Sequence, residues 1–477
     1  MKKILVFALT VAMLLSLAVI GTSAAADEWD GTTATSFASG TGTEADPYVI
    51  ATAEELAYLA AQVKAGTTYE GQYFVLNSDI DLKKTEWTPI GVYMGKDKPE
   101  NVAFAGSFDG KGHTVSGISI TSDANSLYCG LFGYVCTKGY LKNLVIADSS
   151  VNTGTAKSRY AGSVAGKLEA AEVSSLVAKA DVTVSSAGSA GGVCGRIVGA
   201  KAEYLINHAT VTTSAAESSA FGGGICGALG GTATLEYAVN YGHVSGEGAF
   251  HGGITGITGG DEGPGALSNC VNYGNVDYTG AKGWYVGGIA GCFGHTAGHN
   301  YTGTNCYNFG TVTFPETNTK EVAIGEIIGE ARKGTIQITD CYSVDLEGIN
   351  SVGKESVTPT LTNVATKTVD ELNTLADAVV ATVNANIVVP SEPVAPETTE
   401  PVAPETTEPA PETTEPAPET TEPAPETTEP ARETTEPAPE TTEPGTSGDT
   451  GDAAIIFAVI ALLSVTAVAV VAKKREN

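Results

Sequence analysis

A glycine block returns along this chain every 29 to 38 residues. Each copy has the form Gly-x-x-x-Gly, and the copies start at Gly162, Gly191, Gly223, Gly252, Gly287 and Gly325. A period in this range is typical of proteins built from stacked structural repeats. The chain between about Tyr128 and Tyr342 is therefore predicted to be a stack of similar units.

A second block follows the glycine block and places an asparagine four residues before a valine in four repeats. The pairs are Asn207 and Val211, Asn240 and Val244, Asn272 and Val276, and Asn308 and Val312. Because Asn and Gly enter the left-handed backbone region at low cost, the block predicts a tight corner with positive φ. In a stack, the four amides should bond in a line, and the rings of Tyr241, Tyr273 and Phe309 should stack.

Short β-branched runs such as Val-Thr-Val and Val-Thr-Phe lie between these blocks, and each has one apolar face. No segment between the repeats has the length and 3.6-residue period of a packing helix. We therefore predict an all-β fold, a parallel β-helix (β-solenoid) with one coil per repeat and coils about 4.8 Å apart. The valines of the second block should point into its core.

Together the two blocks resemble the GLUG-type repeats of bacterial surface proteins. Residues 269–276 read Asn-Cys-Val-Asn-Tyr-Gly-Asn-Val, and residues 305–312 read Asn-Cys-Tyr-Asn-Phe-Gly-Thr-Val. The resemblance covers most of residues 46–345. It implies a right-handed parallel β-helix shown on the outside of the bacterium in an adhesin-like role, and it does not name a ligand.

The N-terminal segment, residues 1–26, has the pattern of a secretory signal peptide. Lys2 and Lys3 precede an apolar run, and the small residues 23–26 offer a cleavage site. Residues 27–120 are predicted to form an N-terminal cap and the first coils, and residues 121–366 the repeats.

Two capping boxes predict helices beside the repeats. Thr52 to Glu55 opens a helix that ends near Ala65, and Thr368 to Glu371 opens a second helix within residues 367–390. The apolar stripe of the second helix is Leu372, Leu375, Val379 and Val383. An uncovered solenoid end presents a bare sheet edge, so we expect the two helices to cover the two ends.

Residues 391–450 repeat Glu-Pro-Ala-Pro-Glu-Thr-Thr, which predicts a disordered, extended stalk. Within residues 451–477, the apolar run from Ala453 to Ala472 is long enough to span a membrane, and a basic tail follows it. This order resembles a Gram-positive sorting signal, in which a sortase joins Thr450 to peptidoglycan, although Ser447-Gly448 replaces the usual Leu-Pro. The protein is therefore predicted at the cell surface, anchored to the cell membrane or the cell wall.

Charge and motifs limit the partners. The formal net charge of −29 opposes binding to nucleic acid, so none is expected as a partner. No catalytic, cofactor-binding or metal-binding residue is assigned, and no cofactor is expected. Asn77, Asp79 and Asp81 alternate, which fits either an oxygen-ligand cation site or a solvated corner. Phe108 to His113 has the Asp and Gly-His elements of β-helix polysaccharide hydrolases, and a turn explains it equally well.

The cysteines fall into repeat columns, without a Cys-x-x-Cys pair. Cys194 and Cys226 share one column, and Cys270, Cys306 and Cys341 share another, whose other positions hold Leu or Ala. Such a column indicates buried free thiols acting as small apolar side chains, rather than a zinc site. Adjacent coils could also bring two of them within disulfide distance.

Three functions fit this organisation. The first is a surface adhesin or display module for an extracellular glycan or protein ligand, with Trp87, Trp284 or Tyr285 stacking on sugar rings. The alternative is a polysaccharide lyase or glycoside hydrolase, which needs converging carboxylates or a base beside a bound cation. The third is a metallopeptidase, but His295 and His299 lack the glutamate of His-Glu-x-x-His.

Overall fold

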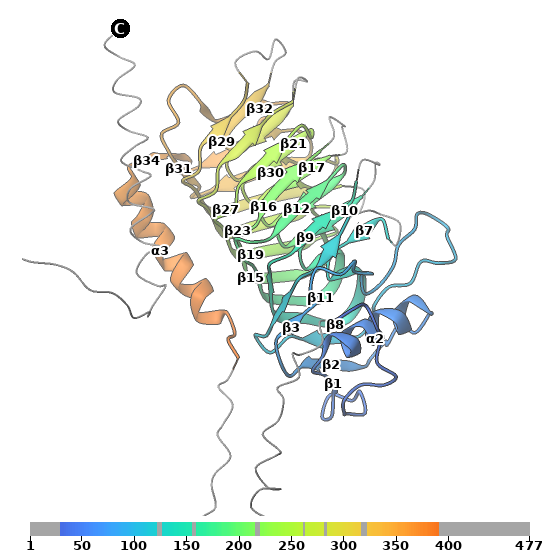
Figure 1. The fold of residues 1–477 in the computed structure, drawn as a ribbon. Coiled ribbons are helices and arrows are strands. Elements are labelled where there is room, and N and C mark those ends of the chain that lie inside the picture. The colour runs from blue at the N-terminus through green and yellow to red at the C-terminus, as the bar shows by residue number, and fades with distance from the viewer. Residues whose placement is uncertain are drawn as a thin grey trace, which may run out of the picture. The chain divides into compact units, whose positions relative to one another are not determined.

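The computed structural model describes residues 29–121, 126–154, 159–214, 220–260, 263–280, 284–315 and 322–390. Over these residues the chain is a parallel β-solenoid of about 8 turns (Figure 1). Equivalent repeat residues pair in register, so that Val244 faces Val276 and Asn240 faces Asn272. The predicted parallel β-helix with one coil per repeat is confirmed.

The N-terminal part holds one helix and the first strands. Its elements are β1 (Tyr48–Ile50), α2 (Ala53–Lys64), β2 (Tyr73–Leu76), β3 (Ile80–Asp81), β4 (Ser107–Asp109), β5 (Thr114–Ser116) and β6 (Ser119–Ile120). Thr52 and Glu55 form the expected capping box of α2. The helix buries Leu56, Leu59 and Val63 in the same core as the first strands.

The repeats then pass through rows of strands, one of each row per coil. The glycine-block row holds β7 (Tyr128–Cys129), β10 (Tyr160–Gly162), β13 (Ser189–Gly191), β17 (Phe221–Gly223), β21 (Phe250–Gly252) and β25 (Tyr285–Gly287). The next row holds β14 (Cys194–Val198), β18 (Cys226–Gly230), β22 (Thr255–Thr258) and β26 (Ala290–Phe293). The third holds β15 (Lys201–Asn207), β19 (Ala233–Asn240), β23 (Gly265–Asn272) and β27 (Asn300–Asn308). In the early coils, β8 (Phe132–Ala147) and β11 (Ala165–Ala178) run through both of these last rows.

A separate sheet forms another side of the solenoid. It holds β6, β9 (Ser150–Asn152), β12 (Thr183–Ser186), β16 (Thr210–Thr213), β20 (Val244–Gly246), β24 (Val276–Tyr278) and β28 (Val312–Thr313). The last coils contain β29 (Ala323–Ala331), β30 (Thr335–Thr339), β31 (Tyr342–Val344), β32 (Asn350–Glu355), β33 (Thr360–Thr362) and β34 (Ala365–Lys367), followed by helix α3 (Val369–Asn386).

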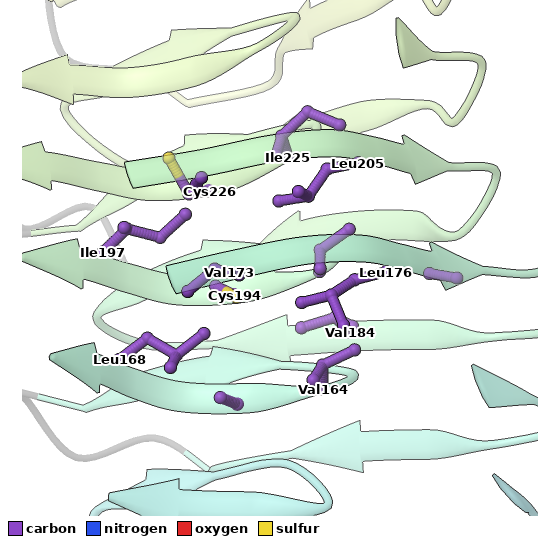
Figure 2. Packing of buried hydrophobic residues seen from close by; sticks show 14 of the residues in the cluster. Val164, Leu168, Val173, Leu176, Val184, Cys194, Ile197, Leu205, Ile225 and Cys226 are labelled. Atoms are coloured by element: carbon purple, nitrogen blue, oxygen red, sulfur yellow. The ribbon is translucent and has the colours of Figure 1, made fainter. Parts of the chain in front are cut away.

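The interior is a continuous apolar core. Figure 2 shows Leu168, Ile197 and Cys226 of successive coils pointing into it. The valines of the second block are buried as predicted, namely Val211, Val244, Val276 and Val312. Burial of such ladders in every coil is the main stabilising contribution to the stack.

The asparagine column forms the predicted line of amides. Asn207 donates to Asn240, Asn240 to Asn272 and Asn272 to Asn308, each at 2.8 Å, and all four side chains are buried. Beside it, the ring of Tyr241 stacks on that of Tyr273 at 5.1 Å, and Tyr273 on Phe309 at 4.7 Å. His208 extends this ring stack by one coil.

The positive-φ corner does not lie where the sequence analysis predicted it. It lies three residues before the asparagine column, with φ between 51° and 59° at Asn143, Ser175, Tyr204, Tyr237, Asn269, Asn305, Asp340 and Asn363. Tyr and Ser occupy this column as well as Asn, because the parallel pairing on both sides fixes the backbone there. The prediction of a left-handed corner at the Asn207 column is therefore wrong.

Helix α3 also lies elsewhere than predicted. It does not cover the end of the solenoid but runs back along its flank (Figure 1). Leu372, Ala376, Val379 and Val383 pack on an outward-facing apolar column of five successive coils, namely Val177, Ile206, Val239, Val271 and Tyr307. This column needs cover along the whole stack, which explains why the helix follows the flank.

The predicted signal peptide, the stalk and the span from Ala453 to Ala472 lie outside the described residues. Within the described ranges, neither helix has the length and apolar character needed to cross a membrane.

Candidate functional site

A bulge in β8 shapes the surface beside the first coils. Thr137 and Tyr140 of β8 pair with Ala170 and Glu172 of β11, so that β8 holds one extra residue between the pairs. The Thr137 hydroxyl accepts a hydrogen bond from the Gly139 N–H at 2.9 Å, which fixes the bulge. A Cβ on Gly139 would overlap the Ser107 hydroxyl, so a larger residue there would displace that hydroxyl. Bulges of this kind often re-aim side chains at functional sites.

The bulge separates two hollows. The larger has a volume of about 490 Å³ and is lined by Glu70, Gly71, Tyr73, Ala105, Ser107, Cys136, Thr137, Lys138 and Gly139. The smaller, of about 350 Å³, is lined by Thr137, Lys138, Glu169, Ala170, Val198 and Gly199. We call the larger hollow the β8 groove. Its volume lies within the range of small-ligand sites.

The β8 groove combines an aromatic wall with polar groups. Tyr73 lies on β2, and its ring centre is 6.1 Å from that of Tyr140. The Lys142 ammonium sits 4.0 Å from the Tyr140 ring centre and holds that ring in place. Lys138 is exposed on the bulge, and the described residues give it no ion-pair partner. A ring face, an ammonium, hydroxyls and a carboxylate within one groove can bind a hydroxylated ligand.

Cys136 lies in the β8 groove but is not an activated nucleophile. Burial, and then the nearby Glu169 carboxylate, raise the pKa of its thiol. Glu169 in turn accepts a hydrogen bond from the Tyr134 hydroxyl at 3.3 Å and pairs with Lys167. With its pKa raised, the Cys136 thiol stays protonated at neutral pH. Because the thiolate is the reactive form, this cysteine is not activated for nucleophilic attack.

The candidate cation site of the sequence analysis is a set of protein-internal contacts. The Asp79 carboxylate accepts a hydrogen bond from the Thr114 N–H at 2.9 Å and lies 3.1 Å from the His113 ring. Asp81 pairs with Lys83 at 2.9 Å. Among the described residues, no cluster of three or more His, Cys, Asp or Glu side chains has a geometry suited to a metal ion.

The Asp and Gly-His segment forms a corner of an early coil. Asp109 is buried and accepts hydrogen bonds from the Lys111 N–H and the Asn143 amide, both at 2.8 Å. His113 faces Asp79 rather than Asp109. These contacts fit the turn interpretation of the segment.

The aromatic residues proposed to stack on sugars do not form one exposed site. Trp87 is buried, and its indole N–H donates to the Leu131 carbonyl at 3.0 Å, so its predicted exposure is wrong. Trp284 and Tyr285 are half-buried beside Phe250.

The sequence analysis did not identify Tyr73 or the bulge at Thr137 to Gly139 as site residues. The one sequence signal for the bulge is an extra residue in a single repeat, and Tyr73 belongs to no motif.

The two histidines with metallopeptidase-like spacing have different neighbours. The His295 ring packs against Phe221 and Phe250, each at 6.0 Å, whereas His299 packs against Tyr301 at 6.4 Å. Each ring therefore has a packing role in its own surroundings.

The cysteine columns are buried free thiols, as predicted. Cys194 pairs in register with Cys226, and Cys270 with Cys306. All eight cysteines are free, and Cys136 alone is exposed. Burial raises the pKa of Cys226 to about 12, which fits an apolar packing role.

Comparison with known proteins gives partial matches. No protein-family model matches the chain. Halomucin of Haloquadratum walsbyi is 35% identical over 145 residues, which are 29% of this chain and 2% of halomucin. A "Putative Gly-rich membrane protein" of Evansella cellulosilytica is 32% identical over 122 residues, which are 24% of this chain and 12% of that protein. The chain thus spans only a small part of either relative.

Among solved structures, the chain is similar to one described as "a putative immunoglobulin A1 protease from Bacteroides ovatus". The TM-score is 0.48 at 21% identity, and the match covers 72% of this chain and 90% of that chain.

Proposed function

We propose that this protein is an envelope-displayed β-solenoid of the GLUG-repeat type that binds an extracellular glycan in the β8 groove. The observation that carries the proposal is the groove itself. Tyr73 supplies a ring, and Ser107, Thr137, Lys138 and Glu70 supply hydrogen-bonding groups around it. Sugars present both apolar ring faces and hydroxyls, so this combination suits them.

The surface location rests on the sequence. The signal peptide of residues 1–26, the stalk of residues 391–450 and the apolar span that follows together describe an anchored extracellular protein. The partial matches to halomucin and to a protein named as a membrane protein fit an envelope location.

Binding is favoured over glycoside hydrolysis. A glycoside hydrolase needs two carboxylates on either side of one scissile bond. Among the described residues, the β8 groove is lined by the single carboxylate of Glu70, and the smaller hollow by that of Glu169. Thr137 and Lys138 stand between the two hollows, so the carboxylates do not share one.

A glycan array probed with the labelled full-length protein tests this proposal. We expect Tyr73→Ala to weaken binding to the selected glycan about tenfold, the size of one lost ring contact, and Tyr73→Phe to retain it. Thr210→Ala, at an exposed position in the separate sheet, is the control. If the wild-type protein binds no glycan, or if Tyr73→Ala binds as tightly as wild type at equal thermal stability, the proposal is wrong.

A further inference from the structure

The two ends of the solenoid are built differently. At the N-terminal end, the outer edge of β1 is closed, because the Val49 N–H donates to the Ser39 carbonyl at 3.0 Å, and α2 packs into the core beside it. At the C-terminal end, β32, β33 and β34 each pair with the preceding coil alone, with β29, β30 and β31 respectively. Within the described part of the chain, no strand or helix covers their outer edges, because α3 leaves along the flank.

The core also ends openly there. Leu361 of β33 pairs in register with Ile338, whose side chain is 1% exposed in the core. Leu361 continues the same inward column but is 41% exposed, because no further coil lies above it. Thr360 and Thr362 on either side are exposed as well. An open row of backbone donors and acceptors around an apolar side chain is a template for strand pairing.

Strand β33 lacks the usual protection of such an edge. Natural proteins blunt exposed edges with charged side chains, above all lysine. The Lys354 ammonium is held 3.1 Å from the Tyr285 hydroxyl, and Lys367 lies over the Tyr342 ring at 4.5 Å from its centre. Both lysines are thus folded back onto the preceding coils. Strand β33 itself reads Thr-Leu-Thr and carries no charge, in a chain whose formal net charge is −29.

We propose that a second copy of this chain docks on the C-terminal end of the solenoid, with β33 of the two copies paired edge to edge. The N-terminal end is closed, so head-to-tail stacking is blocked, and a two-fold contact between identical ends is the arrangement left. A two-fold axis makes the two strands antiparallel. It then places Leu361 opposite its own copy and Thr360 opposite Thr362, so that no like charges meet.

The course of the chain favours a second copy over the chain's own tail. The N–H of Val388 donates to the Ser175 hydroxyl at 2.9 Å, and Val388 to Pro390 lie against Gly112 of an early coil. The described chain therefore ends beside the first coils, far along the stack from β33. Cover of β33 by the following residues would need them to return over the whole solenoid.

Analytical ultracentrifugation of the full-length protein, in detergent where extraction requires it, tests the proposal between about 1 and 100 µM. We expect a reversible dimer for the wild type and for Thr210→Glu, a control with a charge at an exposed strand position away from the end. Leu361→Glu brings two carboxylates together, so it should raise the dimer dissociation constant at least tenfold. Because Leu361 is partly exposed, this variant should keep the thermal stability of the folded chain.

A second readout locates the contact. The Leu361→Cys variant should form a disulfide-linked dimer in a mild oxidant, and Thr210→Cys should not. A wild-type monomer over the whole concentration range overturns the proposal, whether β33 stays open or residues after 390 cover it. A dimer that Leu361→Glu leaves intact also overturns it, because the contact then lies on another surface.

Discussion

At the scale of single residues, the glycine block and the asparagine column form one device. Four of the blocks also have a glycine at their second position, directly after the first glycine. A Cβ on this glycine would lie 2.0 to 2.3 Å from an asparagine amide, for Gly192 against Asn207, Gly224 against Asn240, Gly253 against Asn272 and Gly288 against Asn308. The glycine therefore makes room for the amide. Asn207, Asn240 and Asn272 then each donate to the next coil, and all four amides donate to their own backbone two residues on, as Asn240 does to Gly242 at 2.9 Å. The two motifs recur together because the asparagine amide occupies the space that the glycine leaves.

Replacing one amide in this line should be costly. Asn240→Ala leaves buried partners on Asn207, Asn272 and Gly242 without their hydrogen bonds, so we expect a loss of about 3 kcal/mol in the free energy of unfolding. Denaturant unfolding measures it. Asn300→Ala, at an exposed position at the start of β27, is the matched control and should change stability by under about 0.5 kcal/mol. Equal losses in the two variants contradict a structural amide line.

His251 should make stability depend on pH. It is fully buried against Thr213, and burial lowers the pKa of its imidazole to about 4. In the unfolded chain the group titrates near pH 6.5, so the unfolded state alone binds the proton between about pH 6.5 and 4. The contribution of neutral His251 to the free energy of unfolding is therefore complete above pH 6.5. It is lost as the pH falls toward 4, by up to about 3 kcal/mol.

The comparison with His251→Val isolates this contribution, because valine occupies the same column in the next coil at Val286. The variant should be less stable at pH 7, but its stability should fall less steeply between pH 6.5 and 4 than that of the wild type. Parallel stability-versus-pH curves for the two proteins rule out His251 as the titrating group.

Residue patterns predicted the core and the ladders but not the corner. The Val276 and Asn272 columns could be recognised because identical residues recur where identical coils need them. The left-handed corner could not, because Tyr204, Tyr237 and Asn269 share one backbone conformation that the flanking strands impose. The β8 groove was hidden for a related reason. In the sequence, one extra residue at the bulge cannot be distinguished from ordinary variation in loop length, and Tyr73 belongs to no recognisable motif.

At the scale of elements, α3 is a strap whose length matches its task. Its 18 residues span about 27 Å, which is enough to cover the four steps of about 19 Å in total between the five coils. The sequence predicted its extent and its apolar stripe, but not its place, because a stripe does not name the surface it packs on. The place where α3 packs is indicated instead by the outward-facing residues of the strands. Val177, Val239 and Val271 are apolar on an outward face that would otherwise be polar, so that face needs cover.

Charging the buried face of the strap should release it from the flank. Val379→Asp places a carboxylate in the interface with Val239 and Val271, so we expect faster hydrogen exchange throughout α3 and a loss of about 3 kcal/mol. Ala378→Asp, on the exposed face one residue away, should leave both nearly unchanged. Protection of the inner strands, such as β19, should persist in both variants. Unaltered exchange in α3 of Val379→Asp contradicts the strap.

At the scale of the whole molecule, the solenoid is proposed to be displayed from the cell envelope by a C-terminal anchor. The solenoid presents the β8 groove at its N-terminal coils, and an open strand edge at its C-terminal end. The anchor prediction rests on the span from Ala453 to Ala472 and the imperfect sorting motif before it.

Fractionation of the producing cells tests the anchor. We expect boiling detergent to extract the protein at one size with residues 473–477 still present, as for a membrane helix. Release by muramidase alone, without those residues, indicates sortase attachment through Thr450 instead. Full-length protein found in the culture medium, with none in the envelope fraction, contradicts both forms of anchoring.

Glycan binding in the β8 groove can be tested by a crystal structure of the protein with the glycan that the array selects. We expect a sugar ring against Tyr73, with its hydroxyls bonded to groups of the bulge such as Thr137 and Lys138. A glycan bound on another surface, with the β8 groove empty, would contradict it.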